Sequence, residues 1–154
     1  MTAHASLTGA DLHEPKGVAA ADSGQVYIAD GAGSGTWTTL VNANKAYITA
    51  RLEDISTAKS VFVVPGVAGD VSKIYSVIDG IIATADCTLS FEIAGTPITS
   101  GDITIAYSGS AAGDVDSSTP SAANTITAGQ AIEIITSGAS TNTVNATITF
   151  IIDL

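Results

Sequence analysis

A few side chains in this sequence have the types and spacing that chemistry requires. The alternating carboxylates Asp114 and Asp116 could offer oxygen ligands to Ca²⁺. The residues that follow them lack the glycine and the bidentate glutamate of an EF-hand loop, so a solvated loop is the preferred interpretation. The two aspartates stay weak metal candidates, and no cofactor is expected.

The positions of the histidines argue against nucleophilic catalysis. A cysteine or serine nucleophile needs a histidine nearby as its base. His4 and His13 both lie near the N-terminus, far in sequence from the single cysteine, Cys87. Cys87 lies in an alternating apolar stretch, so we expect it to be a small buried side chain. The sequence therefore does not predict an enzyme.

Two other patterns are open to a chemical and a structural interpretation. The glycines Gly31, Gly33 and Gly35 are spaced like a phosphate-binding loop, but no lysine and no helix follow them. A turn is the better interpretation. The aromatic residues could stack on sugar rings, although isolated aromatics in strands more often belong to a core or an interface; they are Tyr27, Trp37, Tyr47, Tyr75 and Tyr107.

The composition limits the partners of the chain. Five basic residues stand against fifteen acidic ones in 154 residues, so binding to nucleic acid or to an anionic membrane is not expected. Charged residues make up 13% of the chain, against a usual share of about 25%. With so few charged residues, part of the protein surface is expected to be buried against other chains. Because residues 1–20 show no basic segment followed by an apolar run, we expect synthesis in the cytoplasm without a secretion signal.

Alternating apolar residues separated by turn residues predict an all-β fold. Expected strands include residues 46–52, 60–64, 73–79, 88–94, 102–107, 129–136 and 143–153. Their length and number favour a jelly-roll-like antiparallel β-sandwich over residues 44–154. The last strand keeps a strict period of two, so it is expected to be central in its sheet. Residues 108–123 are expected to form a long loop because they are too polar for a strand.

Residues 1–43 differ from the rest of the chain in composition and in the pattern of their apolar residues. They are rich in small and polar residues, and Pro15 favours extended backbone before it. Asp30 and Gly31 form a hairpin turn signal between two short alternating runs. We therefore expect an extended N-terminal arm with a small β-hairpin, followed by a separate body.

The arm resembles a known group of proteins. The stretches 12–18, 24–27 and 31–37 are similar to the N-terminal segment of tailed-bacteriophage head decoration, cement or head-fibre proteins. The resemblance implies a non-enzymatic virion structural protein, usually a homotrimer, on the outer capsid surface. Such a protein would be made in the host cytoplasm, bind the major capsid protein and reinforce contacts between capsomers.

On this resemblance, residues 1–43 are the candidate docking segment. Its expected contacts with the capsid are Leu12, His13, Pro15, Val18, Val26, Tyr27 and Trp37. Extended backbone suits such docking because strand pairing supplies affinity without a preformed core. The alternative is a tail-fibre or surface-fibre module that binds host glycans through its tyrosines and the 108–123 loop.

Overall fold

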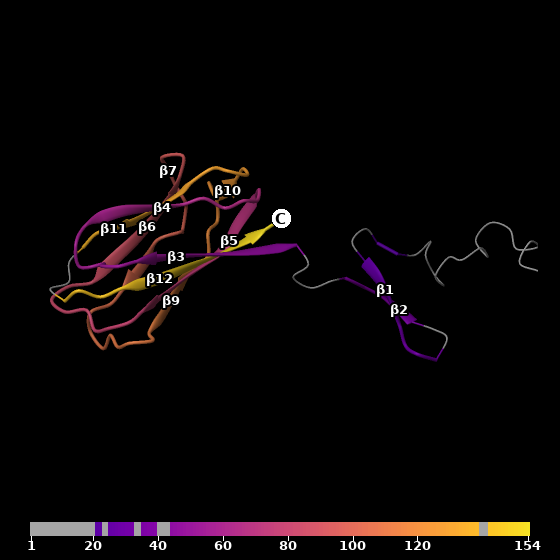
Figure 1. Cartoon of the computed structure of the whole chain (residues 1–154), viewed down its shortest axis with the longest axis horizontal. Helices are drawn as coiled ribbons and strands as arrows, with labels where there is room; N and C mark the ends of the chain where they lie inside the picture. The colour runs from indigo at the N-terminus through magenta and orange to yellow at the C-terminus, as the bar shows by residue number, and fades with distance from the viewer. Residues whose placement is uncertain (1–20, 23–24, 33–34, 40–43, 139–141) are drawn as a thin grey trace, which may run out of the picture. The chain divides into compact units, whose positions relative to one another are not determined.

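The computed structural model describes residues 21–22, 25–32, 35–39, 44–138 and 142–154. The chain divides into two compact units, Met1–Ala43 and Asn44–Leu154. Within the described residues every regular element is a β-strand (Figure 1). In this part of the chain no helix is long and apolar enough to cross a membrane.

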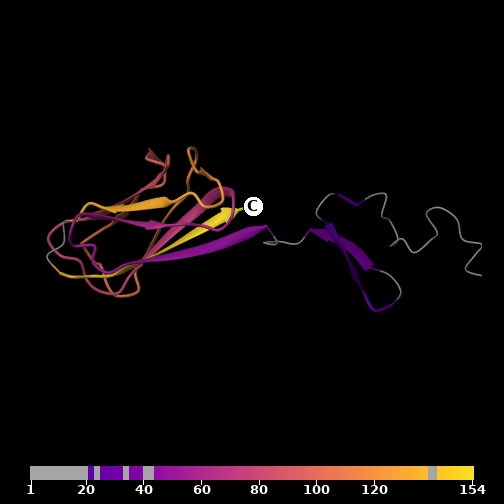
Figure 2. The same cartoon turned by 45° about the horizontal axis from the view of Figure 1, so that its top comes forward.

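The second unit, called the body here, contains two five-stranded sheets (Figures 1 and 2). The β12 sheet has the order β10-β5-β12-β3, and β9 also pairs with β5. Its strands are β3 (Lys45–Leu52), β5 (Gly69–Ile78), β9 (Val115–Ser118), β10 (Thr125–Ile126) and β12 (Ala146–Asp153). All of these pairings are antiparallel.

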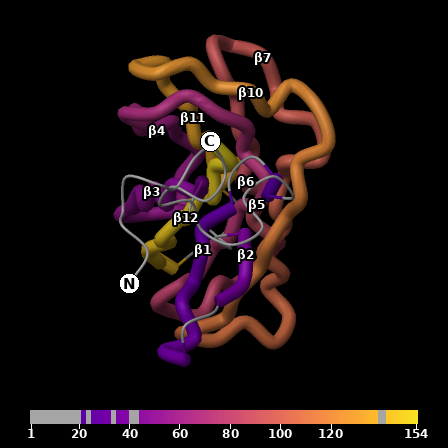
Figure 3. The backbone as a smooth tube through the Cα atoms, turned by 90° about the vertical axis from the view of Figure 1, so that its right-hand side faces the viewer, coloured from indigo at the N-terminus to yellow at the C-terminus, as the bar shows by residue number. Residues whose placement is uncertain are grey.

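The β11 sheet has the order β4-β11-β6-β7, and β8 also pairs with β6. Its strands are β4 (Lys59–Val63), β6 (Cys87–Ile93), β7 (Thr96–Pro97), β8 (Ile103–Ile105) and β11 (Ile132–Thr136). These pairings are antiparallel as well. β3 and β4 end their respective sheets and lie at the same edge of the body (Figure 3).

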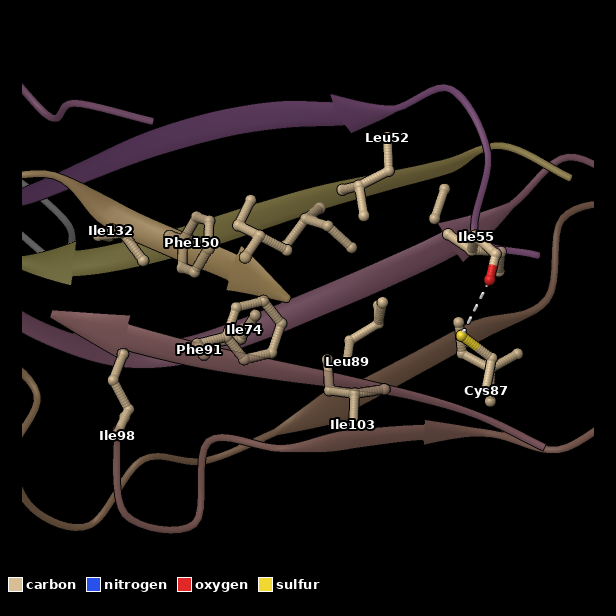
Figure 4. Packing of buried hydrophobic residues seen from close by; sticks show 14 of the residues in the cluster. Leu52, Ile55, Ile74, Cys87, Leu89, Phe91, Ile98, Ile103, Ile132 and Phe150 are labelled. Carbon is tan, nitrogen blue, oxygen red and sulfur yellow. Dashed lines mark hydrogen bonds between the residues drawn. The ribbon is translucent and has the colours of Figure 1, made fainter. Parts of the chain in front are cut away.

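The two sheets enclose one apolar core. Every second residue of β6, β11 and β12 is buried, as period-two alternation requires when one face of a sheet is covered. Phe91 of the β11 sheet meets Phe150 of the β12 sheet edge to face, with ring centroids 5.5 Å apart (Figure 4). The predicted all-β antiparallel sandwich is confirmed.

β12 is the centre of its sheet, as its sequence pattern predicted. It pairs along its whole length with β3 on one side and with β5 on the other. Its inward residues are fully or almost fully buried; they are Ala146, Ile148, Phe150 and Ile152. Full burial of an isoleucine or phenylalanine side chain stabilises the fold by about 1.5–3 kcal/mol.

The long loop predicted over residues 108–123 is wrong in its middle part. Val115–Ser118 form β9, which pairs with residues Ile74–Val77 of β5. Three of its four residues are polar: Ser117 faces outward, Asp116 is half-buried, and the buried Ser118 donates its hydroxyl proton to the carbonyl of Gly101. Pairing to β5 overrides the weak strand propensity of these residues.

We predict that Phe150→Ala lowers the free energy of unfolding by about 3–5 kcal/mol, because it removes a buried aromatic side chain and leaves a cavity. The measurement is the urea midpoint followed by circular dichroism. Phe62→Ala is the matched control, since Phe62 is 65% exposed on edge strand β4. The control should stay within about 0.5 kcal/mol of the wild type. Equal losses for both variants would contradict the assigned core.

Candidate functional site

The candidate residues that the structure describes in the first unit lie on one hairpin. β1 (Gln25–Ala29) pairs antiparallel with β2 (Gly35–Thr39). Tyr27 is directly opposite Trp37, and their rings meet edge to face with centroids 5.3 Å apart. Such a pair contributes about 0.5–1.5 kcal/mol beyond its buried area, so it helps to fix the hairpin register.

The two faces of this hairpin both carry apolar side chains. Tyr27 and Trp37 share one face, and Val26 and Ile28 share the other. Neither strand contains a charged residue. Ile28 is 51% exposed. A two-stranded hairpin is at best marginally stable in water. Packing of these faces against another protein surface would therefore stabilise the hairpin.

The sequence hypothesis did not include Ile28 among the docking residues. The alternating run had nevertheless placed it beside Val26, and that period-two spacing was the signal that could have found it. The register puts Ile28 opposite Thr36, which is a small partner that leaves the isoleucine open. Ile28 therefore joins Val26, Tyr27 and Trp37 as a candidate contact residue.

Two of the three spaced glycines have structural roles. Gly31 has φ of 76°, and the backbone N–H of Ala32 donates to Asp30 Oδ1 at 2.8 Å, as in an Asx turn. A Cβ on Gly35 would lie 2.2 Å from the carbonyl oxygen of Ile28. For these two glycines a turn and a close strand approach explain the spacing without a phosphate. Gly33 lies outside the described residues.

Four residues of the docking hypothesis cannot be placed. The described part of the chain begins at residue 21. The four residues lie before it; they are Leu12, His13, Pro15 and Val18. Their role in docking therefore stays a prediction from the sequence.

Asp114 directly precedes β9, and Asp116 lies within β9. They line a depression of about 180 Å³ together with Ser108, Ser110 and neighbouring residues of this connection. Asp114 accepts a hydrogen bond from the backbone N–H of Ala111 at 2.6 Å, which closes a tight turn. Asp114 thus has a structural role in this connection.

The surroundings of Asp116 disfavour the ionised form of its carboxyl group. It is half-buried on the inward side of β9, opposite the buried Ser76. Burial, and secondarily the charge of Asp114, raise the pKa of Asp116 above its usual value. No group of three or more acidic, histidine or cysteine side chains that could hold a metal ion occurs among the described residues. The arrangement is that of a carboxyl that folding favours in its protonated form.

Cys87 is a core residue, as expected. Its side chain is fully buried, and its thiol donates to the carbonyl oxygen of Ile55 at 3.6 Å (Figure 4). The sulfur also lies 3.2 Å from Thr136 Oγ1. These contacts give the buried thiol and the buried Thr136 hydroxyl polar partners at the end of the core.

The tyrosines of the body are exposed and are not core residues. Tyr47 on β3 and Tyr75 on β5 both point outward from the β12 sheet, on either side of β12. Tyr107 is exposed in the connection after β8. The structure therefore brings two of the predicted aromatic candidates onto one sheet face and leaves the third elsewhere.

Known structures include one with this arrangement of strands. The chain superposes on a chain of the acidic stable capsid structure of Helicobacter pylori bacteriophage KHP30, with a TM-score of 0.50 and 16% sequence identity. The match covers 74% of this chain and 90% of that chain. At this level of identity the likeness shows a shared fold. Neither a protein-family model nor a curated protein sequence matches this chain.

We predict that Asp116→Asn makes the protein more stable than the wild type at pH 7. Folding raises the pKa of Asp116, so the stability that this carboxyl contributes is present at acid pH and is lost as the pH rises through its folded-state pKa. The asparagine has no charge to bury. The advantage of the variant should therefore shrink as the pH falls and the wild-type carboxyl becomes protonated. Urea midpoints across a pH series measure this difference.

Asp153→Asn is a control of opposite sign. The hydrogen bond from Lys45, followed by that from Ser72, lowers the pKa of Asp153. Its contribution is therefore present at neutral pH and is lost as the pH falls through the folded-state pKa. This variant should be less stable than the wild type at pH 7. A destabilised Asp116→Asn protein at pH 7, or a difference that does not change with pH, would contradict the assignment.

Proposed function

We propose that this chain is a non-enzymatic structural protein of a tailed-bacteriophage virion, which decorates the outer capsid surface and reinforces contacts between capsomers. The observation that carries the proposal is the fold it shares, over most of both chains, with a chain of a phage capsid structure. The resemblance of the stretches 12–18, 24–27 and 31–37 to the arms of decoration and cement proteins supports the same class.

The first unit supplies the docking segment in this proposal. The two strands of its hairpin contain no charged residue and carry apolar side chains on both faces, which suits contact with another protein more than exposure to water. Val26, Ile28, Tyr27 and Trp37 are the anchors on the hairpin. The partner is the major capsid protein, and the hairpin edge offers backbone groups for strand addition.

The body acts as a homotrimer in this proposal. The low share of charged residues, 13% of the chain, favours burial between copies. Three linked docking segments bind with higher avidity than one, because binding of the first raises the effective concentration of the others. A ligand that binds only the assembled shell stabilises that shell by mass action, which is the physical basis of cementing.

Cosedimentation with undecorated capsids tests this docking. We expect Ile28→Asp to weaken binding at least tenfold, because it places a charge in an apolar contact. Ile81→Asp is the matched control, since Ile81 is 59% exposed in the body and Ile28 is 51% exposed in the hairpin. The control should bind like the wild type. Binding of Ile28→Asp at wild-type strength would contradict docking through the hairpin.

A further inference from the structure

The outward side of the β12 sheet differs from the rest of the body surface. We call it the outer β12 face. Its side chains alternate with the buried ones on four strands; they are Lys45, Tyr47, Thr49, Arg51, Lys73, Tyr75, Val77, Val115, Ser117, Thr147, Thr149, Ile151 and Asp153. Tyr47 is opposite Ile151, and Val77 is opposite Val115. The face thus combines apolar and β-branched side chains in neighbouring rows.

Charge is distributed unevenly over the body. Residues 44–154 hold four basic and eleven acidic side chains. Three of the four basic residues, Lys45, Arg51 and Lys73, point out from the β12 sheet. The acidic residues at the ends of the same face are Asp70, Asp79 and Asp153. Positive and negative charges therefore balance on this face, and the net negative charge of the body lies elsewhere.

The charges on the outer β12 face are arranged in pairs at its two ends. Lys45 forms an ion pair with Asp153 at one end. Arg51 Nη2 lies 3.5 Å from Asp79 Oδ2 at the other end. Each end carries one cation and one acid, so around a threefold axis one end of the face can meet the opposite end of the next copy's face with cations toward acids.

The outward side of the β11 sheet has the opposite character. Glu92 and Glu133 are directly opposite each other on β6 and β11, and such like-charged neighbours repel. Phe62 is opposite Glu133 on the next strand. A copy of this acidic chain that approached this side would meet uncompensated negative charge.

We infer that the outer β12 face is the surface through which copies of this chain contact one another. A second copy carries the same net negative charge, so the face on which cations and acids balance is where two copies repel each other least. The inference rests on the self-association included in the proposed function, and it names the contact surface.

A second copy explains this face better than a glycan does. Stacking on sugar needs open aromatic rings, and Lys73 Nζ lies 5.6 Å from the centroid of the Tyr75 ring. The same ammonium group donates to Thr119 Oγ1 at 2.9 Å. These two contacts hold the lysine stem along the face, where it leaves one tyrosine, Tyr47, with an open ring.

The test is the molar mass of the full chain by light scattering over a concentration series. The wild type should have a multiple of the 15.3 kDa chain mass. Tyr47→Glu should raise the dissociation constant of the oligomer at least tenfold. Phe62→Glu is the matched control and should keep the wild-type mass, since Phe62 and Tyr47 are 65% and 56% exposed on the two edge strands. Val115→Glu is a second variant, in case Tyr47→Glu fails to fold by circular dichroism.

The outcomes separate this inference from the proposed function. A wild-type oligomer that Tyr47→Glu and Val115→Glu leave intact would overturn the contact surface alone. A wild-type chain that stays at 15.3 kDa would overturn both the contact surface and the homotrimer, although the docking test on the hairpin would still stand. Variants that keep their mass but lose capsid or glycan binding would assign the face to that other ligand and overturn the inference.

Discussion

Burial of the inner faces of two sheets against each other is the constraint on which the body depends. β12 carries most of this constraint, because it pairs with β3 and β5 at once and turns an unbroken row of apolar side chains inward. Phe150 meets Phe91 across the sandwich, so the two sheets are held in register by an aromatic pair at the centre. Without this row the β11 sheet would lose the apolar surface against which its inward side chains pack.

The same constraint determines which side chains are free to contact other molecules. Once the inward residues are used for the core, the outward faces and the hairpin carry the surface chemistry. The strands of the hairpin carry apolar side chains and no charge, and the outer β12 face carries cations and acids that balance. Such surfaces suit extended contact with other proteins, which is what the proposed decoration of a shell requires.

The sequence predicted the parts of the fold in which period-two alternation is strong. β12 and its central place followed from alternation alone, and so did the burial of Cys87 in β6. The hairpin followed from the turn signal at Asp30 and Gly31. β9 was missed because its four residues are polar and become a strand only by pairing with β5, which is a contact distant in sequence. The aromatic pair of Tyr27 and Trp37 depends on hairpin register, which spacing alone does not fix.

A cryo-electron microscopy map of the parent virion is the most direct test of decoration through the hairpin. Density for the β-sandwich body should lie on the outer surface of the shell at repeated lattice positions, and density for the hairpin should contact the major capsid protein. Density for the body inside the shell, or at the tail alone, would contradict decoration.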